Sequence, residues 1–168
     1  VMRSFAKSTL IAAVLSKLAN SVALADVVGQ INFTGEITAA TCLINNSKTL
    51  TQTVDMGEVS ASYVNHTSYK GTLFDLDFTL CSKAPKVEFV NFDSATGVLP
   101  LSADAKAKNV GIVLLRDGTQ LTSNEITDLA LNEDRVKVTL LAKYKHIGSD
   151  PIAPGSASAT TDVNVVYE

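Results

Sequence analysis

Few side chains in this 168-residue sequence combine the type and spacing that catalysis or metal binding requires. The sequence has two cysteines, Cys42 and Cys81, and two histidines, His66 and His146. Each histidine stands alone in a polar, turn-like stretch, where a solvated side chain is more common than a base or a metal ligand. Two cysteines are too few for a four-ligand zinc site. The sequence therefore predicts no metal site.

The hydroxyl and carboxyl groups form no recognisable catalytic pattern. Serine and threonine are abundant, but no G-x-S-x-G sequence is present to make one of them a nucleophile. Asp75 and Asp77 lie two residues apart, so on a strand they would share one face and could act as a carboxylate pair. The solvent face of a half-buried strand is the simpler interpretation. Since glycine-rich nucleotide-binding motifs are also missing, we expect no cofactor, no small-molecule substrate and no enzymatic activity.

Composition excludes two further classes of protein. The 14 basic and 17 acidic residues give a net charge of −3, which argues against nucleic acid as a partner because phosphate binding needs a concentrated basic surface. Hydrophobic residues make up 46% of the chain and charged residues 18%, so the chain is expected to fold rather than stay disordered. Its length suits a single domain.

The N-terminus has the features of a secretory signal. Arg3 and Lys7 precede a short apolar stretch, and Ala23-Leu24-Ala25 has the A-x-A pattern of a cleavage site. The alternative is an uncleaved membrane anchor, but Lys17 interrupts the apolar stretch well before the roughly 20 residues that a bilayer requires. Residues 1–25 are therefore predicted to be a signal peptide, and the remaining chain is predicted to be exported.

Export changes the interpretation of Cys42 and Cys81, because oxidising compartments allow disulfides to persist. A single pair of cysteines in an exported domain favours a structural bridge over a catalytic thiol. The bridge would close a loop of about 40 residues, which corresponds to ~4 kcal/mol in the chain-entropy model.

Hydrophobic and polar residues alternate along most of the remaining chain, as in half-buried strands. Arg116-Asp117-Gly118 has the composition of a tight turn. A sustained helical stripe is missing, and only residues 102–108 and 124–131 are candidates for short helices. The sequence therefore predicts one antiparallel β-sandwich. The expected strands cover residues 31–37, 50–56, 74–80, 87–89, 109–115, 136–144 and 163–167.

Seven short motifs occur in a fixed order along the chain, and the order is more specific than any one motif. They are Gly29–Ile37, Val54–Gly57, Phe74–Cys81, Asn109–Ile112, Ala142–Tyr144, Pro154-Gly155 and Val163–Tyr167. With the spacing of the two cysteines and the penultimate tyrosine, this set resembles the pilin subunits of chaperone–usher fimbriae, in particular type 1-like pilins of Gram-negative bacteria. One departure is Asn91, which stands where a glycine is expected.

The resemblance implies an all-β, incomplete immunoglobulin-like sandwich of six strands that lacks the last one. A donor strand from a neighbouring subunit would complete it. Residues 26–37 would be the N-terminal donor-strand extension and residues 38–168 the pilin domain. The alternative for residues 26–37 is the ordinary first strand of a complete sandwich. The alternating residues expected to enter the neighbour are Gly29, Ile31, Phe33, Gly35 and Ile37.

The resemblance also implies a function and partners. The chain would be a shaft subunit of an adhesive fimbria that polymerises with identical or related pilins by donor-strand exchange. It would pass through the periplasm, with a chaperone and an outer-membrane usher, to the cell surface. The alternatives are a minor adaptor pilin, a free-standing secreted binding sandwich and a small secreted hydrolase. The C-terminal strand that the chaperone would recognise carries Val163, Val165, Tyr167 and Glu168.

Overall fold

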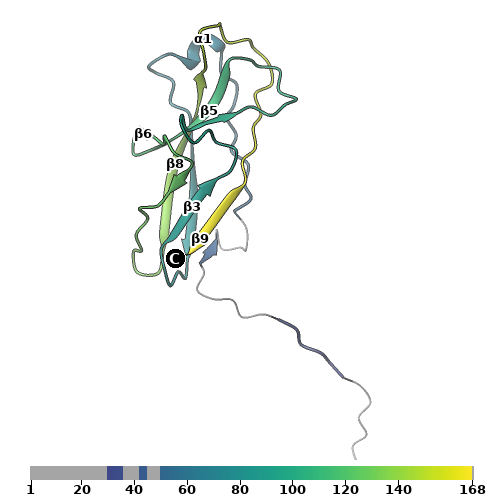
Figure 1. Ribbon diagram of the computed structural model, residues 1–168, viewed down its shortest axis with the longest axis vertical. Coiled ribbons are helices and arrows are strands. Elements are labelled where there is room, and N and C mark those ends of the chain that lie inside the picture. Colours follow the sequence, from purple (N-terminus) through teal and green to yellow (C-terminus); the bar gives the residue numbers. More distant parts are fainter. Residues whose placement is uncertain (1–29, 36–41, 45–49, 168) are drawn as a thin grey trace, which may run out of the picture. The chain divides into compact units, whose positions relative to one another are not determined.

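The computed structural model describes residues 30–35, 42–44 and 50–167 (Figure 1). The chain divides into two compact units, residues 1–37 and residues 38–168. In the first unit, the described residues 30–35 form no strand, and all of them are exposed. The predicted signal peptide lies outside the described residues.

The second unit consists of two antiparallel sheets. The larger has the order β1-β2-β8-β5-β4, with β6 paired to β5, and the smaller has the order β7-β3-β9. This confirms the predicted all-β, immunoglobulin-like class. The strands are β1 (Leu43–Ile44), β2 (Thr72–Thr79), β3 (Pro85–Phe89), β4 (Val98–Pro100), β5 (Val110–Arg116), β6 (Thr119–Gln120), β7 (Glu125–Ile126), β8 (Val136–His146) and β9 (Val163–Tyr167).

The core lies between the two sheets and follows from the alternation along the strands. Leu76 and Phe78 of β2 and Leu140 of β8 are at most 1% exposed, whereas the residues between them face solvent or are half-buried. Val87 and Phe89 of β3 cover this surface from the smaller sheet. Because successive side chains of a strand point to opposite faces, each strand contributes one apolar row to the core.

Two turns explain local features of the sequence. Asp117 and Gly118 both have positive φ angles, +51° and +79°, between the paired residues Arg116 and Thr119. Two consecutive positive φ angles define the type I′ turn, which confirms the predicted tight turn. Asn91 has φ +72°, and asparagine is among the few residues that tolerate this region. The replacement of the expected glycine by Asn91 is therefore compatible with the turn.

Four of the predicted elements differ from the structure. The first is the strand expected over residues 31–37, whose described residues 31–35 form no strand. Residues 50–56 form no strand, although Val54 and Met56 pack against the core. Residues 102–108 are not helical, because most of their backbone amides donate to residues 153–158, and only the amide of Ala105 donates within the segment, to the carbonyl of Ser102. Residues 124–131 contain β7 in place of a helix. Short segments have little helical stability of their own, so pairing with a distant segment prevails.

The described part of the chain has one helix, α1 (Ala61–Val64). It lies at the end of the sandwich opposite the C-terminal end of β9 (Figure 1). None of the helices among the described residues is long and apolar enough to span a membrane.

Candidate functional site

β9 is an edge strand of the smaller sheet. Within the described residues it pairs with β3 alone, and the two strands run side by side in Figure 1. Val163, Val165 and Tyr167 point toward the core but are only half-buried, whereas Asn164 and Val166 are exposed. A row of core-facing residues that stays half-buried indicates that part of its covering layer is missing.

The backbone of β9 has polar groups that face away from β3. The amide of Val90 donates to the carbonyl of Asp162 at 2.8 Å, which places this pair among the hydrogen-bonded pairs of the ladder. In an antiparallel ladder such pairs alternate with non-bonded ones. Asn164 therefore bonds to β3, and the N–H and C=O groups of Val163 and Val165 point to the open side. Among the described residues no strand pairs with these groups, so an additional strand could form ladder hydrogen bonds with them.

A groove of about 1200 Å³ opens between the sheets beside this free edge. Its walls include residues 50–57, which form neither a helix nor a strand, and residues 156–163, which lead into β9. Most of its floor is apolar and comes from both sheets. The floor residues are Phe74, Leu76, Phe89, Leu99, Ile112, Leu114, Ala142 and Tyr144. A missing strand would leave such a space.

The wall formed by β9 continues toward the N-terminus beyond the strand itself. Ala157, Ala159 and Thr161 are half-buried and alternate with exposed residues, in phase with β9. The amide of Ser102 donates to the carbonyl of Ser158 at 2.9 Å, so this stretch is held from outside the groove. Sequence reasoning missed it because alanine, serine and threonine differ little in hydrophobicity.

The predicted disulfide between Cys42 and Cys81 is present. It joins the start of β1 to the end of β2, and the amide of Cys42 also donates to the hydroxyl of Tyr167 at 3.1 Å. The structure thus brings three of the predicted residues together at one end of the sandwich. The bridge and this hydrogen bond hold the end of β9 in place beside the groove.

The remaining predicted residues are placed as follows. Ile31 and Phe33 are 83% and 92% exposed, and a Cβ atom built on Gly35 would meet no atom within 4 Å. Val163 and Val165 line the groove, and Tyr167 is half-buried at the end of β9. Gly29, Ile37 and Glu168 lie outside the described residues.

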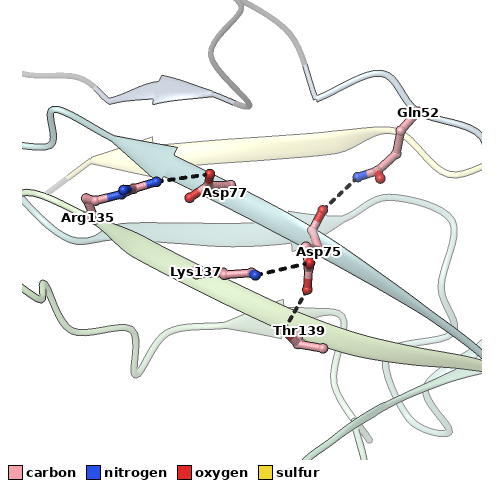
Figure 2. A network of polar contacts seen from close by, with 6 residues as sticks. All are labelled: Gln52, Asp75, Asp77, Arg135, Lys137 and Thr139. Carbon is pink, nitrogen blue, oxygen red and sulfur yellow. Dashed lines mark hydrogen bonds and ion pairs between the residues drawn. The ribbon is translucent and has the colours of Figure 1, made fainter.

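Asp75 and Asp77 lie on the outer face of β2 and are bound to β8 (Figure 2). The Oδ2 atom of Asp75 lies 3.4 Å from Nζ of Lys137, and the Oδ2 atom of Asp77 lies 3.5 Å from Nη2 of Arg135. The Thr139 hydroxyl donates to Asp75 at 2.6 Å. This hydrogen bond, and then Lys137, hold the pKa of Asp75 below its ordinary value. Each carboxylate has its own cation, which fits the interpretation as a solvent face.

Both histidines take part in local hydrogen bonds. Nδ1 of His66 accepts from the amide of Ser68 at 3.1 Å, and Nε2 of His146 donates to the carbonyl of Asp150 at 2.6 Å. These contacts hold turns at the end of the sandwich that carries α1.

Comparison with known proteins identifies the fold and the family. The family model described as "Fimbrial protein" matches residues 31–168. A chaperone–usher pilus structure is similar with TM-score 0.59 and 18% identity, over 83% of this chain and 95% of that chain. The antigen and type I fimbria protein of Burkholderia pseudomallei is similar with TM-score 0.50 and 28% identity, over 83% of this chain and 97% of that chain.

No curated protein matches the sequence closely. The family model nevertheless covers most of the chain, and the structural similarity extends over 83% of it. The protein belongs to the fimbrial protein family and has the immunoglobulin-like fold of chaperone–usher pilus subunits.

Proposed function

We propose that this chain is a structural, non-enzymatic shaft subunit of an adhesive fimbria, and that it polymerises by donor-strand exchange. The observation that supports this most directly is the free edge of β9 beside an apolar groove of about 1200 Å³. An exposed edge over an open core is unstable in water and invites a further strand. Addition of a strand supplies ladder hydrogen bonds, while its alternate side chains fill the groove.

The donor would be residues 26–37 of the next subunit. In their own subunit Ile31 and Phe33 are almost fully exposed, so their burial in a neighbour gains roughly 1.5–3 kcal/mol each. With Gly29, Gly35 and Ile37 they form one face of an extended strand, because they are spaced by two. The proposed pilin domain is residues 38–168.

Before assembly, a periplasmic chaperone would occupy the groove and bind the C-terminal strand, including Tyr167 and Glu168. The half-buried side chains of Val163 and Val165 support this, because a lent strand would cover them. Residues 1–25 would direct export, and an outer-membrane usher would deliver the chain to the fimbrium on the cell surface.

A polymerising subunit is preferred over a free-standing binding sandwich because the groove and the proposed donor segment would together form both parts of an intersubunit joint. A subunit with a groove and a donor segment is able to extend a polymer in both directions. A minor adaptor pilin would share these features, whereas a free-standing binding sandwich would have no use for an open edge.

The test is a synthetic peptide of residues 26–37 added to the purified chain that starts at Asp26. If the peptide fills the groove, the midpoint temperature of unfolding rises with peptide concentration, because the ligand binds only the folded state. A peptide with Phe33→Asp is the matched control and should give a much smaller rise. Equal effects of the two peptides, or no rise with either, would contradict the proposal.

A further inference from the structure

Two leucines at the disulfide end of the sandwich are exposed, Leu43 by 43% and Leu80 by 63%. Leu43 follows Cys42 at the start of β1, and Leu80 precedes Cys81 just after β2. Leu43 lies opposite Thr79 in the pairing of these strands. Both leucines therefore lie within one residue of the disulfide, on adjacent chain segments.

The conformation of Leu80 is unusual for its residue type. Its φ angle is +51°, a region that asparagine and glycine adopt far more readily than a bulky residue. Because 63% of the residue is exposed, its side chain contributes little to the core of its own subunit. Folding of the isolated subunit therefore gives little reason for a leucine at this position, whereas contact with a partner outside the subunit would give one.

Chain connectivity determines which partner reaches this end. This step rests on the proposed donor-strand function. The donor segment ends at Ile37, five residues before Cys42. Five residues span at most about 18 Å when fully extended. The subunit that takes up the donor strand must therefore lie against the end of the sandwich that carries Cys42, Leu43 and Leu80.

We propose that Leu43 and Leu80 form a contact surface with which each subunit packs against the second copy of this chain that holds its donor strand. The surface on that second copy must be a different one, because an open-ended polymer needs head-to-tail contacts. The two leucines would add a domain–domain contact to the strand exchange and stiffen the joint between successive subunits.

The experiment compares fibres with single subunits whose groove is filled by the peptide of residues 26–37. The variant combines Leu43→Thr, which suits a strand, with Leu80→Asn, which suits the positive φ angle. We expect the variant fibres to lose subunits about tenfold faster than the wild type at a fixed denaturant concentration. The peptide-filled subunit should keep its midpoint temperature, because the peptide brings no neighbouring domain.

Leu73→Asn is the matched control, since Leu73 is 68% exposed at the other end of β2. It should leave both measurements unchanged. Equal dissociation of variant and wild-type fibres would overturn the inference, as would an equal loss of stability in the peptide-filled subunit. Failure of the peptide to stabilise even the wild-type chain would instead refute the donor-strand function, and the inference would fall with it.

Discussion

Replacing Gly35 with leucine tests the proposed donor strand at the position that carries no side chain. Ile31, Phe33 and Gly35 are spaced by two, so in a strand all three point into the neighbouring groove. A glycine in this row suits a place where the groove is too narrow for a Cβ atom. On the floor of the groove, Leu76 and Leu114 are only 1% and 5% exposed, so they are packed in the core and have little room to move aside for a larger side chain.

A leucine side chain at this position would overpack the groove. Overpacking typically costs about 1–3 kcal/mol, which corresponds to a loss of roughly 5- to 150-fold in affinity between subunits. The folding of the subunit itself should not change, because a Cβ on Gly35 meets no atom within 4 Å. Fibre growth followed by electron microscopy and light scattering, together with thermal unfolding of the single subunit, separates the two effects.

Thr34→Leu is the control, because Thr34 points to the opposite side of the same strand and should tolerate the change. If Gly35→Leu assembles normally while Thr34→Leu fails, the assignment of the inward face is wrong by one residue. If both variants grow fibres at the wild-type rate, residues 26–37 do not act as a donor strand and the reasoning is refuted.

Three further predictions concern the domain that carries the groove. Cys81→Ser should lower the free energy of unfolding by about 2–5 kcal/mol, and a normal yield of periplasmic protein would count against it. Removal of Tyr167 and Glu168 should abolish chaperone capture, which co-purification with the chaperone measures; undiminished capture would show that another element is recognised. Asp75 has a lowered pKa, mainly through the Thr139 hydroxyl, so its contribution to stability is present above the unfolded value near 3.9 and is lost as the pH falls through the lower folded value. Asp75→Asn should therefore lose less stability than the wild type on acidification below about pH 4, as measured by chemical unfolding at several pH values.

Much of the sandwich could be predicted from local patterns. Strands β2, β8 and β9 have a clear contrast between alternating apolar and polar residues, so their inward faces were evident. The disulfide could also be predicted from the sequence, because two cysteines allow only one intramolecular bridge. The tight turn at Asp117-Gly118 followed from residue types that accept positive φ angles.

Elements were harder to predict where apolar and polar residues alternate weakly, or where the segment has no strand to pair with. Residues 50–56 alternate like a strand, yet they run along the groove without a ladder in the described structure. A segment forms a strand only when a neighbouring segment supplies its hydrogen bonds, and the tertiary structure decides which segment lies beside it. Residues 102–108 illustrate the reverse case, since their pairing with residues 153–158 replaced the predicted helix.

The sequence alone determined which side of β9 faces the core, because alternation assigns Val163, Val165 and Tyr167 to one face whether or not the strand has a second neighbour. Only the tertiary structure decided that β9 lies at the edge of its sheet, with β3 as its sole partner in the described residues. The position of a strand within a sheet depends on how distant segments pair, and the alternation of side chains along the strand does not determine that pairing. The groove of about 1200 Å³ follows from that position, because the core-facing rows of two sheets enclose a space that no described strand fills.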